Sequence, residues 1–266
     1  MTYNIKLYKM IIIKELQRFF IYRTNIFTGI MTALFMLGAR YALWMALFAT
    51  GNAVQSSLLE TMTYFIISGI IFVWISPSYG NNIGEDIRSG DIAQRLIRPC
   101  SYHLMLIASF HATSMASTLI RSLPTLIVAL IFISILPPAS TSIFLFFLLA
   151  VILGAIIFSL VDLIISYTAF WMTDFWYLSW FKRALFTLFG GLAVPLWFYP
   201  EWLRMICEYL PFQYTIYQPL AIYLGRVSPD QIITTIAVQV FWVAVLFLIE
   251  RIVWRFVQKK LVVQGG

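Results

Sequence analysis

Charged residues are scarce in this sequence. Asp, Glu, Lys and Arg make up 11% of the 266 residues, whereas a soluble domain carries about 25%. The shortage excludes a globule coated by water, because too little polar surface is available to cover it. Apolar residues reach 61% and aromatic residues 17%. This composition indicates a protein whose solvent is largely lipid, with aromatic side chains at the two headgroup layers.

Residues that could support chemistry are also few. The chain has two cysteines and two histidines, in no spacing typical of a metal site or a disulfide framework. No glycine is followed directly by lysine, so the phosphate-binding loop of many ATPases is missing. We therefore expect no catalytic residue, metal or cofactor in the chain. The net charge of +7 includes no long basic run, which disfavours nucleic acid as a partner.

Long apolar segments predict an all-α, polytopic membrane protein, since about 20 apolar residues cross a bilayer as a helix. Six transmembrane helices are expected, over residues 26–50, 58–78, 104–136, 143–170, 180–198 and 232–257. Fourteen of the 18 Lys and Arg then fall on one side, and the positive-inside rule places both termini in the cytoplasm. Cys100 and Cys207 lie on opposite sides and should not pair. If Cys207 is exposed, a thiol reagent added outside should label it.

The segment before the first span forms a predicted cytoplasmic unit, residues 1–23, ahead of a transmembrane domain over 24–266. Apolar and basic residues alternate at near-helical spacing over 3–22, which favours a helix lying in the membrane interface. A frayed leader is the alternative. No small-residue cleavage site precedes the first span, so we expect the segment to stay in the mature protein.

Four charged residues fall inside predicted spans, where an unneutralised charge costs several kcal/mol. They are candidates for a polar pathway, with structural pairing or snorkelling toward an interface as the alternative. Pro124 and Pro195 also fall inside spans and predict kinks. The four charged residues are Arg40, Arg121, Asp162 and Glu250.

The predicted cytoplasmic loop over about 80–100 mixes charges with apolar residues at helical spacing. Ser89-Gly90-Asp91 predicts the end of one short helix and the start of another, and Pro99 ends the second. Such an amphipathic pair suits docking of a soluble partner, although a solvated connector is the alternative. The candidate contact residues are Glu85, Asp86, Arg88, Asp91, Arg95 and Arg98.

The predicted external segment over about 199–226 is too apolar for an ordinary loop. We expect short re-entrant helices here, between spans five and six, because irregular backbone at membrane depth must be buried in protein or line a wet cavity. The segment is a candidate outer gate, with a hydrophobic cap on the bundle as the alternative. The gate candidates are Pro195, Trp197, Tyr199, Trp202, Pro211 and Phe212.

Several motifs, in this order, resemble the permease subunits of type-2 ATP-binding-cassette (ABC) exporters, in the branch with compact six-span permeases. They are DIRSGDIAQRLIRP at 86–99, AFW at 169–171, GGLAVPLWFYPEWL at 190–203, LPFQYTIYQPLAIYLG at 210–225 and VQGG at 263–266.

The resemblance implies two separate cytoplasmic ABC ATPase subunits that hold ATP and Mg²⁺, and a second permease, either a sister chain or a copy of this one. It assigns the loop at about 84–98 to coupling with the ATPase, and it implies export from a bacterial plasma membrane. A lipophilic small molecule, a peptide or a lipid-like compound is the expected substrate. The alternatives are an ion-gradient-driven transporter or channel, whose relay would be Arg40, Arg121 and Asp162, and a non-transporting membrane scaffold.

Overall fold

The computed structural model describes residues 23–51, 56–75, 79–96, 102–171 and 176–264, together with Met10, residues 12–14 and Gln17. Every regular element within these ranges is helical, which confirms an all-α fold. The predicted interfacial helix over 3–22 falls almost wholly outside the described residues. The long elements are α2 (Arg23–Ala49), α3 (Leu58–Ile75), α6 (Tyr102–Ser117), α7 (Leu123–Phe132), α8 (Thr141–Ser166), α9 (Trp176–Phe189) and α12 (Pro229–Gln264).

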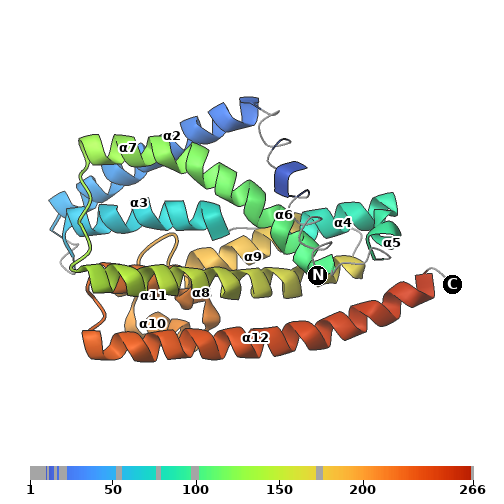
Figure 1. The fold of residues 1–266 in the computed structure, drawn as a ribbon. Helices are drawn as coiled ribbons and strands as arrows, with labels where there is room; N and C mark the ends of the chain where they lie inside the picture. Colours follow the sequence, from blue (N-terminus) through green and yellow to red (C-terminus); the bar gives the residue numbers. More distant parts are fainter. Residues whose placement is uncertain are drawn as a thin grey trace.

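Shorter elements gather at the two ends of the long helices (Figure 1). At one end lies a pair of helices, α4 (Tyr79–Ser89) and α5 (Asp91–Leu96). Toward the other end lie α10 (Glu201–Glu208) and α11 (Tyr217–Tyr223). Short turns complete the chain: the π-helix η1 (Thr118–Ser122) and the 3-10 helices η2 (Tyr167–Phe170), η3 (Leu196–Phe198) and η4 (Pro211–Tyr214).

Within the described ranges, five helical stretches are long and apolar enough to cross a membrane. They are Ile26–Ala49, Leu58–Ile75, Met105–Phe132, Thr141–Phe170 and Pro229–Lys259. Each overlaps a predicted span, so the sequence located these five segments correctly. The protein is a multi-pass membrane protein.

The predicted fifth span has the wrong boundary. Helix α9 has 14 residues, or about 21 Å of helix, against a hydrocarbon core of about 30 Å. It ends at Phe189 because Gly190 and Gly191 follow it, and Gly191 has a φ of +78° that only glycine adopts readily. Pro195 therefore lies in extended backbone beyond the helix end and kinks no helix. The six-span count stays a prediction.

The third span contains the expected break at Pro124. Helix α6 passes into the π-helix η1, and Pro124 lies in the first turn of α7. A proline at this position removes one backbone donor and clashes with the preceding turn, and the widened π turn accommodates both effects.

Helix α8 is central and packs against α3, α4, α11 and α12. It carries the small buried residues Ala150, Gly154 and Ala155, which allow neighbouring elements to approach its backbone closely. A Cβ built on Gly154 would meet the backbone oxygens of Thr215 and Tyr214 at 2.8 and 2.9 Å. The Gln239 side chain of α12 donates hydrogen bonds to the Ala150 and Tyr214 carbonyls, at 2.9 and 2.8 Å. These contacts join α8, α12 and η4 into one core.

Gly154→Ala should therefore lower stability by about 1–3 kcal/mol, the usual cost of overpacking a tight core. The added methyl meets backbone atoms, which cannot move aside as a flexible side chain would. Thermal unfolding in detergent measures the effect. Gly38→Ala is the matched control, because Gly38 also lies in a membrane helix and a Cβ there meets nothing within 4 Å. Equal melting temperatures for the two variants would contradict the close approach.

Candidate functional site

The helix pair α4–α5 forms as the sequence predicted. Gly90 separates the two helices with a φ of +77°, and the Ser89 hydroxyl accepts a hydrogen bond from the Asp91 amide at 3.3 Å. Ile83 is fully buried, and Ile87 and Ile92 pack around the same apolar cluster. The pair is therefore a packed part of the bundle and not a solvated connector.

Two of the predicted contact residues are used inside the chain. Asp86 is 3% exposed and forms an ion pair with Arg95 at 3.0 Å, and it accepts a hydrogen bond from the Tyr102 hydroxyl at 3.0 Å. Burial raises the pKa of the Asp86 carboxyl, while Arg95 and Tyr102 act in the opposite direction. These bonds fold α5 back onto α4 and tie both to the start of α6. Asp86 is therefore not available to a partner, and Arg95 is largely committed to Asp86.

The outward face of the pair carries the other candidates. Glu85, Arg88 and Asp91 are exposed, and so is Gln94, which the sequence reasoning did not select. Arg98 lies outside the described residues. The exposed surface of the pair has mixed charge, and we call it the docking face. It consists of Glu85, Arg88, Asp91 and Gln94.

Asp162 lies in a closed polar cluster that links three helices. Its carboxylate is fully buried and forms an ion pair with Lys182 of α9, which is 6% exposed. It also accepts hydrogen bonds from the Tyr79 amide at 3.2 Å and the Ser166 hydroxyl at 3.4 Å. Because Tyr79 is the first residue of α4, the cluster connects the helix pair to α8 and α9. The sequence did not predict Lys182 as the partner.

Glu250 is likewise engaged. It is 3% exposed and accepts a hydrogen bond from the Tyr167 hydroxyl at 2.6 Å, with Arg251 at 3.7 Å on its other oxygen. Asp162 and Glu250 are thus both paired with other side chains of the protein, as the structural alternative to a polar pathway predicted. Arg121 belongs to η1, but its side chain lies outside those described.

Arg40 lines a cavity of about 630 Å³ between α2, α3, α7 and α9. It is half-buried, and its guanidinium lies 5.1 Å from the centre of the Phe65 ring. Arg183 of α9 reaches the same cavity and lies 5.8 Å from the centre of the Phe72 ring. Arg183 was not among the predicted pathway residues. The structure places it within a helix that borders the cavity.

The gate candidates lie in the segment that follows α9. Trp197 is buried against Tyr64, and its ring is covered by the Arg226 guanidinium at 3.9 Å. Arg226 also forms an ion pair with Glu60 at the start of α3. The Tyr64 hydroxyl in turn donates to the Gly191 carbonyl at 2.8 Å. These contacts fasten the segment after α9 to α3.

The remaining gate candidates are spread over the segment. Pro211 is buried, and Phe212 packs on Phe186 and Phe189 with ring centres 5.1 and 6.0 Å away. Trp202 is exposed, and Tyr199 donates through its hydroxyl to the Leu188 carbonyl at 2.8 Å. The arrangement matches a cap packed on the bundle. Cys207 is fully buried in it, so it cannot report topology through an added thiol reagent.

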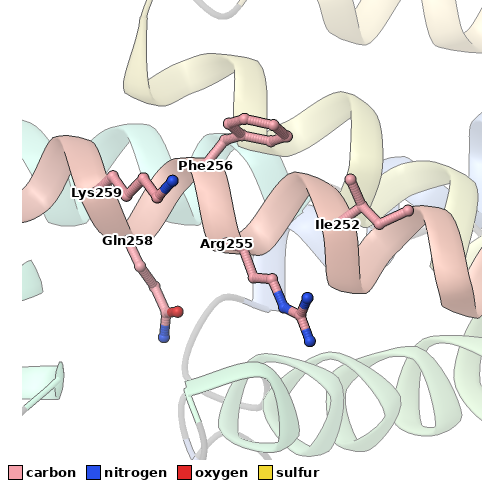
Figure 2. Close-up of a pocket in the computed structure, with 5 residues that line it drawn as sticks. All are labelled: Ile252, Arg255, Phe256, Gln258 and Lys259. Atoms are coloured by element: carbon pink, nitrogen blue, oxygen red, sulfur yellow. The ribbon is translucent and has the colours of Figure 1, made fainter.

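A second hollow lies on α12, lined by Ile252, Arg255, Phe256, Gln258 and Lys259. Figure 2 shows that all five residues come from this one helix, with Arg255 and Gln258 on one side and Phe256 on the other. Among the residues that the structure describes, no second element contributes to this lining. The cavity at Arg40 is the better candidate site.

A comparison with protein families shows to which family the chain belongs. The model of the ABC-2 family transporter proteins matches residues 30–265, which is nearly the whole chain. The chain belongs to this family. No curated protein matches it. As an ABC-2 family member it is a permease subunit of an ABC transporter, and membership implies partnership with an ABC ATPase subunit.

Proposed function

We propose that this ABC-2 permease exports a lipophilic small molecule, a peptide or a lipid-like compound, using ATP hydrolysed by two separate cytoplasmic ATPase subunits. ATP and Mg²⁺ are held in those subunits, and a second permease, a sister chain or a copy, completes the complex. The observation that carries the proposal is the family match over residues 30–265 together with the exposed docking face on a helix pair that is otherwise packed into the bundle.

The placement of charge supports a cytoplasmic position for the helix pair. The apolar cluster around α4 also includes Trp254 and Val257 of α12, and Arg251, Arg255 and Lys259 lie on the same stretch of that helix. The positive-inside rule assigns this basic end to the cytoplasm. We accordingly place both termini inside and the α10–α11 segment outside, in a bacterial plasma membrane.

The polar cluster at Asp162 supplies a mechanical link. A push by an ATPase on the docking face reaches α4, and the Tyr79–Asp162–Lys182 contacts pass it to α8 and α9. Since α9 borders the Arg40 cavity, movement of the helix pair can change the shape of that cavity. In this scheme the permease holds the pathway and transmits force.

The closed cluster also weakens the rival proposal of an ion-gradient-driven transporter. A proton or ion relay needs an acidic group that can be reached and recharged. Asp162 is fully buried and bound to Lys182, Tyr79 and Ser166.

Purification of the chain from its native host in mild detergent, followed by mass spectrometry, tests the proposal. We expect a soluble ATPase with a phosphate-binding loop, with or without a second permease, to accompany it. The chain alone, still transporting in vesicles without ATP, would overturn the exporter assignment. Recovery of unrelated partners with no transport activity would instead favour a scaffold.

A further inference from the structure

The Arg40 cavity is partly open and has the size of a ligand site. Its volume of about 630 Å³ falls within the usual range for small-molecule pockets, roughly 300–1,000 Å³. On α2 it is lined by residues four apart, Thr28, Thr32, Met36 and Arg40, which lie on one face of the helix. From Thr28 to Arg40 this face extends about 18 Å along the helix. Gly29, Ala33 and Gly69 leave room between α2 and α3.

The charged side chains that line the cavity are positive. Its lining includes Arg40 and Arg183 and, among the described residues, neither Asp nor Glu. The structure records no ion pair between either arginine and a residue of the described ranges. Arg40 is half-buried and Arg183 is exposed. Their guanidiniums lie over the faces of Phe65 and Phe72, and a cation–π contact stabilises a cation less than a desolvated ion pair does. Apart from these cations and the hydroxyls of Thr28, Thr32, Ser122 and Thr125, the lining is apolar.

The two arginines lie at different depths. Phe65 and Phe72 are two turns apart on α3, about 10 Å along its axis. Arg183 with Phe72 lies nearer the α4–α5 end, and Arg40 with Phe65 lies nearer the α10–α11 end. One small acidic group could thus be held first by one arginine and then by the other.

We propose that this cavity binds an anionic amphiphile, with the acidic group held by Arg183 or Arg40 and the apolar part lying along α2 and α3. The inference rests on the proposed export function and narrows its substrate class to acidic lipophilic compounds. A membrane phospholipid and a separate lipophilic acid share this chemistry. The cavity distinguishes both from neutral and cationic lipophiles, which leave the two guanidiniums without a counter-ion.

Fluorescence titration with two probes tests the charge requirement. The full-length protein, with any subunits that accompany it, is placed in phosphatidylcholine nanodiscs without ATP. The probes are dansyl-labelled undecanoic acid and its methyl ester, which share a tail and a fluorophore and differ in charge. We expect the acid to bind at least about tenfold more tightly than the ester, with Arg40→Gln and Arg183→Gln each weakening the acid and leaving the ester unchanged.

Matched variants separate a binding role from a structural one. Arg40→Lys keeps the charge and should retain the preference for the acid, whereas the double glutamine variant should bind both probes equally. Arg204→Gln, on the exposed surface of α10, should bind like the original protein. Equal binding of acid and ester by the original protein, or an acid preference that survives in the double variant, overturns the proposal.

A competition experiment distinguishes an anionic phospholipid from a separate lipophilic acid as the natural ligand. If phosphatidylglycerol added to the nanodiscs displaces the acid, the natural ligand is an anionic phospholipid. If it does not, the ligand is a separate lipophilic acid, and the charge requirement stands in either case. Because binding is measured without ATP, its failure is distinguishable from failure of the export proposal, which is decided by the co-purified subunits and by ATP-dependent transport.

Discussion

Asp162→Asn and Lys182→Met should each destabilise the protein by about 3–5 kcal/mol, the usual cost of removing one partner from a buried ion pair. Asp162 is fully buried and Lys182 is 6% exposed, so either charge has almost no access to water when its ion-pair partner is removed. The effect should exceed that of any exposed charge in the described ranges. Thermal or denaturant unfolding in detergent measures it.

The double variant Asp162→Asn/Lys182→Met makes the result specific. With both charges removed, the desolvation cost disappears, and most of the lost stability should return. Glu208→Gln is the control, because Glu208 makes an exposed ion pair with Arg204 at 3.9 Å on α10, and such pairs contribute about 0–1 kcal/mol. Single variants no less stable than this control, or a double variant that loses the sum of both effects, would show that the charges are hydrated.

The same variants separate stability from coupling. The Asp162 cluster contacts the first residue of α4 through the Tyr79 amide, and asparagine retains an oxygen that can accept this bond. The double variant should therefore fold but transmit movement from α4 to α9 less well, since the Lys182 bond is gone. ATP-dependent transport should fall more than stability does.

Helix ends and breaks could be predicted from the sequence where a single residue determines the backbone conformation. Gly90 ends α4 in a conformation that disfavours other residues, so the break in the helix pair was predictable. Within the described residues, the five stretches long enough to cross a membrane were predictable, because such long apolar runs are stable only in lipid. The break at Pro124 follows from the missing backbone donor.

Side-chain contacts between different helices of the bundle could not be predicted from the sequence. Lys182 follows Asp162 by 20 residues and lies in another helix, and no periodicity connects the two positions. Asp86 was a predicted contact residue because it lies in an amphipathic segment, yet the turn at Gly90 brings Arg95 back onto it. Trp197 was a gate candidate, and its neighbours Tyr64 and Arg226 were not predicted because they are far away in the chain.

Coupling to the ATPase depends on the docking face in the proposed mechanism, and the structure changes which residues test it. Arg95 was a natural choice from the sequence, but Arg95→Glu would place a second acid against buried Asp86. Lost activity in that variant would report a damaged helix pair. Glu85, Arg88 and Asp91 are exposed, so replacing one of them should leave the packing of α4 and α5 unchanged.

Arg88→Glu should lower substrate-stimulated ATPase activity of the complex at least about tenfold, because reversing a charge in a protein interface adds repulsion to the lost attraction. Stability should change by less than about 0.5 kcal/mol, as for other exposed substitutions. Gln258→Glu is the control, since it adds a negative charge at an exposed position of α12 beside Val257, which packs in the same apolar cluster as Ile83 of α4. Full stimulated activity in a stably folded Arg88→Glu complex, with Glu85→Lys equally active, would remove the docking role from this face. Selective loss in Arg88→Glu with normal Gln258→Glu activity would place the force-bearing contact on α4.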